Sequence, residues 1–177
     1  LGLEFAFDAI TRQPNTLDAH RLIAWAQTQG GVPDVDALVE GLFRAFFVEA
    51  RRKRAAALPL TPLETIAADW IDAHPEYADD LADLERAQAA TYPGEGGREN
   101  PFLHLSMHLS ISEQVSIDQP RGIRAAVEAL ASRLGSLHEA QHAAMECLGR
   151  MLWEAQRSSA PPDGDAYVDC VRRRATR

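Results

Sequence analysis

Residues 100–118 read NPFLHLSMHLSISEQVSID, and this stretch predicts a buried helix that carries polar side chains inside its apolar face. Asn100 and Pro101 are typical of a helix N-cap and the first helical position. His104 and His108 lie four residues apart, so they share one face of the helix. Apolar residues flank this pair at helical spacing: Leu103, Leu105, Met107, Leu109, Ile111 and Val115. We therefore expect both imidazoles to point into the protein.

Helix signals recur on both sides of this stretch, whereas alternating strand patterns are almost absent. Thr61, Pro62 and Glu64 fit an N-cap, a first-turn proline and a capping-box glutamate, and Ser136 with Glu139 fits another capping box. The predicted helices cover about residues 15–30, 36–57, 62–74, 76–90, 101–117, 121–134 and 137–157, with a short helix after Pro162. The sequence thus predicts an all-α fold in two units, residues 1–57 with two helices and residues 58–177 with a bundle of five or six, and we expect the second unit to fold by itself.

Composition limits the partners of the chain. The net charge of -8 repels nucleic-acid backbones and anionic lipid surfaces, so we expect neither nucleic-acid nor membrane binding. No run approaches the roughly 18 apolar residues of a membrane span. Cys147 and Cys170 lie far apart without a CxxC motif, which indicates free thiols, a reducing compartment and a cytoplasmic location.

A second histidine pair gives the chain its one candidate site. His138 and His142 are also four residues apart, and Glu146 continues their row along the edge of an apolar helix face. Imidazoles with one carboxylate suit a divalent transition metal, and helical bundles build such sites from facing helices. The candidate ligands are His104, His108, His138, His142 and Glu146.

Other interpretations of the histidines stay open. They can be structural residues whose ring nitrogens bond to carbonyl or carboxylate oxygens, and the sequence favours this interpretation over a metal site. Residues 138–142 also read HExxH, the signature of zinc proteases, but the sequence shows no third ligand or substrate-binding strand. His74, before Pro75, is expected to end a helix, and Trp70 and Trp153 are expected to anchor the core.

The N-terminal part resembles the helical insert of DsbA-like thiol oxidoreductases, in the branch of the hydroxychromene-carboxylate isomerases. The resemblance covers residues 1–49 and rests on residues 15–22, Trp25-Ala26, Gln29-Gly30 and residues 42–47. In that family the nucleophile precedes the insert and a cis-proline loop follows it. The resemblance therefore implies a partial DsbA-like helical segment, and no catalytic residue is carried over.

From residue 51 onward the chain resembles a small proteobacterial family, the domain of unknown function 1841. The matching segments are residues 60–64, 74–77, 100–104, 108–109, 119–123, 146–148 and 153–156. This resemblance implies an uncharacterised all-helical domain in residues 58–177 and brings no biochemistry with it.

Two functions follow from the sequence. The first is a non-enzymatic helical binding or interaction domain that binds a divalent metal through its paired histidines and associates with a protein partner or as a homodimer. The second is a fragment of a DsbA-like thiol-disulfide oxidoreductase or isomerase that lacks its nucleophile. The chain contains no complete active site from which a reaction can be named, so we expect no enzyme activity.

Overall fold

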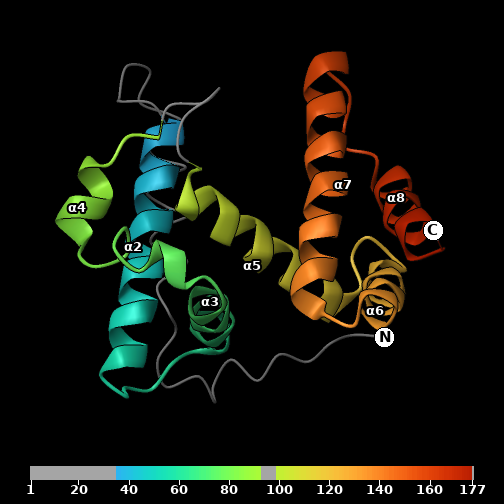
Figure 1. The fold of residues 1–177 in the computed structure, drawn as a ribbon. Helices are drawn as coiled ribbons and strands as arrows, with labels where there is room; N and C mark the ends of the chain where they lie inside the picture. The colour runs from blue at the N-terminus through green and yellow to red at the C-terminus, as the bar shows by residue number, and fades with distance from the viewer. Residues whose placement is uncertain (1–34, 93–98, 177) are drawn as a thin grey trace, which may run out of the picture.

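The computed structural model describes residues 35–92 and 99–176, and the secondary structure in these residues is helical (Figure 1). The predicted all-α fold is therefore confirmed. In chain order the elements are α2 (Val35–Ala55), α3 (Pro62–Ala73), the 3₁₀ turn η2 (Pro75–Tyr77), α4 (Leu84–Ala89), α5 (Pro101–Ile117), α6 (Ile123–Leu134), α7 (Leu137–Ser158) and α8 (Gly164–Thr176). No described helix is long and apolar enough to cross a lipid bilayer.

Local capping residues set most helix boundaries where the sequence predicted them. The Thr61 hydroxyl accepts a hydrogen bond from the Glu64 backbone N–H, and the Glu64 carboxylate accepts one from the Thr61 N–H, which completes the capping box of α3. The Asn100 side chain accepts bonds from the first turn of α5, and the Ser136 hydroxyl accepts one from Glu139. These caps satisfy backbone donors that a helix start leaves free.

The predicted helix over residues 76–90 is wrong in its extent. The structure has the short turn η2, a run of further turns and then the six-residue helix α4. The turns bury Leu81, which is only 1% exposed, while Arg51 donates a hydrogen bond to the Leu81 carbonyl oxygen at 3.0 Å. The Asp83 side chain then caps the shorter helix by accepting from the Arg86 N–H.

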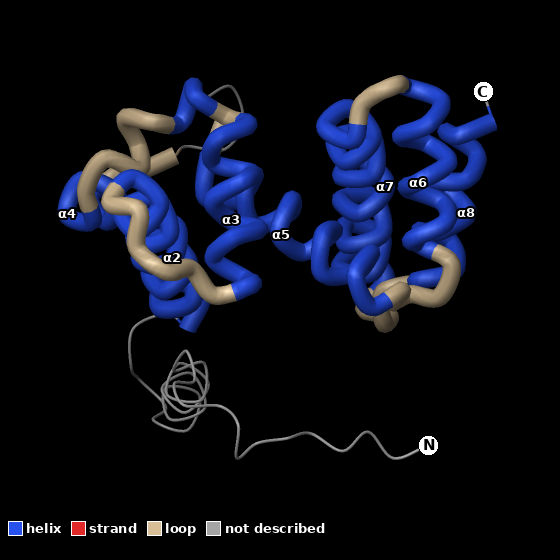
Figure 2. The backbone as a smooth tube through the Cα atoms, turned by 90° about the horizontal axis from the view of Figure 1, so that it is seen from below, coloured by secondary structure: helices blue, strands red, loops and turns tan. Residues whose placement is uncertain are grey.

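The described residues pack around two separate apolar cores, with α5 running from one to the other (Figure 1, Figure 2). The first core gathers residues of α2, α3, η2 and α4 with Phe102, Leu105 and Leu109 of α5. The second gathers residues of α6, α7 and α8 with Ile111 of α5. Because α5 belongs to both cores, the residues near its middle lie where the two groups of helices meet.

The first core contains residues from both sides of the predicted domain boundary at residues 57/58. Phe47 and Ala50 of α2 are fully buried in the same core as Phe102 and Leu105 of α5. Helix α2 lies before residue 58 and packs against helices that lie after it, so the boundary at residues 57/58 and the independent folding of the second unit stay predictions. The predicted helix over residues 15–30, and His20 within it, lie outside the described residues.

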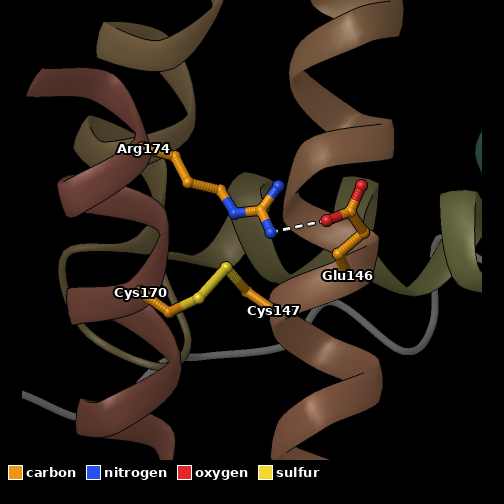
Figure 3. The surroundings of a disulfide bond; sticks show 4 residues. All are labelled: Glu146, Cys147, Cys170 and Arg174. Atoms are coloured by element: carbon orange, nitrogen blue, oxygen red, sulfur yellow. Dashed lines mark hydrogen bonds and ion pairs between the residues drawn. A yellow bond between two sulfur atoms is a disulfide. The ribbon is translucent and has the colours of Figure 1, made fainter. Parts of the chain in front are cut away.

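Two expectations about the second group of helices are wrong. Cys147 and Cys170 form a disulfide that joins α7 to α8 (Figure 3). They lie 23 positions apart in sequence, and the packing of α8 along α7 brings them together. The expectation of a reducing compartment rested on two free thiols and loses that support, because disulfides persist in oxidising compartments. Trp153 is 56% exposed and lies against Arg157, so it does not anchor the core.

Candidate metal centre

Five histidines meet between the two groups of helices, and we call them the histidine cluster: His74, His104, His108, His138 and His142. His74 caps the C-terminus of α3, where Pro75 prevents the helix from continuing. His104 and His108 come from α5, and His138 and His142 come from the first two turns of α7. The i, i+4 spacing of each pair aligns its two rings on one helix face. Three helices thus supply the cluster.

The ring nitrogens of the cluster face one another at short distances. His74 Nε2 lies 2.9 Å from His108 Nε2 and 3.2 Å from His138 Nε2. His142 Nε2 lies 3.3 Å from His108 Nε2 and 3.1 Å from His104 Nε2. One ligand atom from each of four histidines, His74, His108, His138 and His142, lies within 4.8 Å of the other three. A single ion can bind ligand atoms so arranged after small movements of the rings.

Three of the five rings have an acceptor on the side that faces away from the cluster. His74 Nδ1 lies 2.8 Å from the Glu76 carboxylate, and His104 Nδ1 lies 2.7 Å from the Glu99 carboxylate. His108 Nδ1 lies 2.9 Å from Oε1 of Gln141. Metal-bound histidines commonly donate their outer N–H to a carboxylate or carbonyl oxygen, which fixes the tautomer and orients the ring.

A buried network supports the innermost ring. The Trp70 indole stacks on His108 with ring centroids 3.9 Å apart and planes at 13°. Its Nε1–H donates to Ser112 Oγ at 2.9 Å, and the amide of Gln141 donates to the same oxygen at 3.1 Å. His108 is 0% exposed and Gln141 is 3% exposed, so neither can turn toward water. Trp70 therefore packs the core, as expected, and also holds a cluster histidine in place.

Burial keeps the inner histidines neutral. The pKa of His108 is lowered to about 3, mainly by burial, with a smaller contribution from the neighbouring His104, His74 and His142, whereas the bond to Gln141 opposes the shift. Burial also lowers the pKa of His74, against the effect of Glu76. The pKa of His142 is lowered by burial and then by His138 and His104. Neutral imidazole is the form that binds a metal ion.

The outer partners decide which inner nitrogens carry protons. The carboxylate of Glu76 has a lowered pKa, mainly because of its bond to His74, so it accepts and His74 Nδ1 donates. His108 Nδ1 likewise donates to Gln141 Oε1. A neutral imidazole has only one N–H, so Nε2 of both rings is unprotonated. Two lone pairs therefore face each other across 2.9 Å.

Four of the five predicted ligands come together, and the fifth does not. His104, His108, His138 and His142 converge, whereas the Glu146 carboxylate pairs with Arg174 at 2.5 Å and its side chain is 67% exposed (Figure 3). Arg174 is on α8, and nothing in the sequence pairs it with a residue 28 positions earlier. We therefore leave Glu146 out of the ligand set that we propose.

Sequence reasoning assigned His74 to a helix terminus and missed its place in the cluster. It is indeed the C-cap of α3, but its ring is only 3% exposed and touches four other imidazoles. The missing signal is long-range, because His74 has no histidine at i±3 or i±4. Glu76, two residues later, was the local hint of an outer partner.

The fold and the cluster define an all-helical protein with a set of convergent imidazoles, of which His74 and His108 are buried. The family model for the Domain of unknown function (DUF1841) matches residues 25–173, so the chain belongs to this family. The match begins within the segment that resembles the DsbA-like insert, and that resemblance stays a prediction. No curated protein and no solved structure matches the chain.

Proposed function

We propose that this protein binds one divalent transition metal ion through the imidazoles of His74, His108, His138 and His142, with His104 as a fifth, outer ligand. The observation that carries the proposal is the 2.9 Å contact between His74 Nε2 and His108 Nε2, two nitrogens that the outer partners Glu76 and Gln141 leave without a proton. Two lone pairs repel at this distance unless a cation lies between them. A metal ion bound by both nitrogens removes the repulsion.

The spacing of the nitrogens supports an ion at the centre. With metal–nitrogen bonds of 2.0–2.1 Å, two ligands are about 2.9 Å apart at a right angle and about 3.3 Å apart at the tetrahedral angle. The four shortest Nε2···Nε2 distances in the cluster run from 2.9 to 3.3 Å. All-imidazole coordination suits zinc, copper, nickel or iron, and it does not suit magnesium or calcium, which prefer oxygen.

The alternative is a structural cluster held by hydrogen bonds between the rings. His138 could donate from Nε2 to His74, and His142 could donate from Nε2 to His104 or His108. This arrangement satisfies two of those three contacts, because His142 has one proton to donate, and it supplies none for the contact between His74 and His108. The metal accounts for all four contacts at once, and we prefer it for that reason.

The remaining expectations from the sequence, on the type of domain, its partner and its location, are kept as part of this proposal. We keep a non-enzymatic binding domain, in a bacterial protein, as the setting of the metal site, with a protein partner or a second copy as its partner. The alternative function, a fragment of a DsbA-like oxidoreductase or isomerase, rests on residues 1–49, most of which lie outside the described residues. The cytoplasmic location likewise stays a prediction.

The proposal is tested by metal analysis of the purified protein. After incubation with Zn²⁺ and removal of excess ion, we expect about one zinc per chain in the parent and in the control Glu113→Ala, which alters an exposed residue of α5. We expect His138→Ala and the double variant His74→Ala, His142→Ala to lose zinc while their circular dichroism stays helical. A parent that retains no ion would leave the cluster as structural histidines.

A further inference from the structure

One side of the histidine cluster opens into a surface cavity between α5 and α7. The cavity has a volume of about 390 Å³, and His104 and His142 form part of its wall. Its other lining residues are Glu99, Asn100, Leu103, Met107, Met145 and Glu146. The two innermost histidines, His74 and His108, are not part of this wall.

His104 stands between this cavity and the rest of the cluster. Its side chain is 13% exposed, whereas His108 is completely buried. His104 Nε2 lies at hydrogen-bonding distance from one cluster nitrogen, that of His142, and His104 is not among the four histidines whose ligand atoms lie within 4.8 Å of one another. It is therefore the outermost ligand.

His104 is also held less firmly than the buried His108. Its outer partner Glu99 has a side chain that is 64% exposed, and water competes for an exposed carboxylate. Glu99 also accepts a bond from the Tyr77 hydroxyl at 3.2 Å, which ties it to the first core by a single contact. By contrast His108 is held by buried Gln141 on one edge and by the Trp70 ring on its face.

We infer that His104 is a displaceable ligand and that small neutral nitrogen-donor molecules reach the metal through this cavity. The inference rests on the proposed metal site. In the exchange, the bond from the metal to His104 Nε2 breaks and a bond to the donor nitrogen forms, and no charge is transferred. The four remaining imidazoles hold the ion in place while this happens.

The wall of the cavity favours a neutral donor over an anion. Leu103, Met107 and Met145 give it an apolar surface. Among the residues that the structure describes, its charged lining residues are the acids Glu99 and Glu146, without a lysine or arginine. Arg174 reaches Glu146 and offsets that charge, whereas no lysine or arginine in residues 35–92 and 99–176 pairs with Glu99. An imidazole-like molecule therefore fits the site better than azide or phosphate.

The test is rescue of a shortened ligand by imidazole, followed by the visible spectrum of bound Co²⁺. His104→Gly removes the outer ligand and leaves its space joined to the cavity. We expect imidazole to bind the Co²⁺-loaded His104→Gly variant with one-site saturation, to restore the parental spectrum and to slow removal of cobalt by a chelator. Azide should bind at least tenfold more weakly. The matched variant His108→Gly leaves an enclosed space and should show no rescue.

A third variant keeps the inference falsifiable if His108→Gly does not fold. Leu103 is 60% exposed and lines the cavity, so Leu103→Trp in the His104→Gly background should obstruct the route and weaken imidazole binding at least tenfold. Cobalt binding by the parent with no spectral response of His104→Gly to imidazole would overturn the inference and leave the metal site standing. Equal rescue with and without Leu103→Trp would overturn it too. Failure of the parent to bind cobalt or zinc would instead defeat the proposed function.

Discussion

The hydrogen bond between Gln141 and His108 offers a selective way to weaken the metal site. Gln141→Met keeps the length of the side chain and removes the oxygen that accepts from His108 Nδ1 at 2.9 Å. It also removes the donor to Ser112 Oγ, which retains its bond from Trp70. Gln141 contacts no metal ligand atom on the inner side of the cluster, so any loss of affinity acts through the orientation and tautomer of His108.

The expected effect of Gln141→Met is a loss of metal affinity in the metal-bound protein and a loss of stability in the metal-free protein. Loss of an outer partner of a metal-bound histidine typically costs 10- to 100-fold in affinity, or about 1.4–2.7 kcal/mol. In the metal-free protein the stranded N–H would cost about 1–3 kcal/mol, but His108 can move its proton to Nε2 and donate to His74 at 2.9 Å. We therefore expect the metal-free cost near the lower end, about 1 kcal/mol.

The assay is a competitive chelator titration for zinc affinity, with urea unfolding of the metal-free protein beside it. Gln114→Met is the matched control, because Gln114 lies on α5 and bonds to Ser110 rather than to a histidine. We expect Gln141→Met to lose at least tenfold in zinc affinity and the control to lose almost none. Equal zinc affinities for Gln141→Met, Gln114→Met and the parent would refute the reasoning about the tautomer.

Three further predictions concern stability. The folded-state pKa of His108 is about 3, below the usual 6.5, so its contribution is complete above pH 6.5 and is lost as the pH falls toward 3. Between pH 7.5 and 5.5, urea unfolding of the metal-free protein should show a loss of about 1.4 kcal/mol in the free energy of unfolding from this residue alone. The lowered pKa values of His74 and His142 add to this loss. A free energy of unfolding that is constant or higher at pH 5.5 would contradict the prediction. The double variant Cys147→Ser, Cys170→Ser removes a disulfide between residues 23 positions apart and should lower the free energy of unfolding by about 3 kcal/mol in the same assay. An unchanged urea midpoint would argue against the disulfide. Phe47→Ala should cost about 3–5 kcal/mol in the free energy of unfolding, because α2 supplies that ring to a core shared with α5, and a cost below 1 kcal/mol would show α2 to be dispensable.

Local chemistry explains why the sequence predicted most helix boundaries. Thr61, Asn100 and Ser136 cap their helices through bonds to residues no more than three positions away, so a pattern within one turn was sufficient. Residues 76–90 had helical composition as well. There the burial of Leu81 decided the structure, and the residues that contact Leu81 are distant in sequence.

The candidate site was predictable to the same degree. Each i, i+4 pair of histidines could be found because its spacing is a property of one helix. His74, which completes the cluster, and Arg174, which engages Glu146, depend on how separate helices pack. The spacing of Cys147 and Cys170 also said nothing about their pairing, because the contact of α7 with α8 creates it.

X-ray absorption spectroscopy at the zinc edge of the zinc-loaded protein tests the central claim most directly. The account predicts a first shell of nitrogen atoms at about 2.0–2.1 Å, with the outer scattering of four or five imidazole rings. His74→Ala should reduce the number of imidazoles by one, and Glu146→Ala should leave it unchanged. A shell containing sulfur, or one dominated by oxygen with fewer than three imidazoles, would contradict the histidine cluster as the metal site.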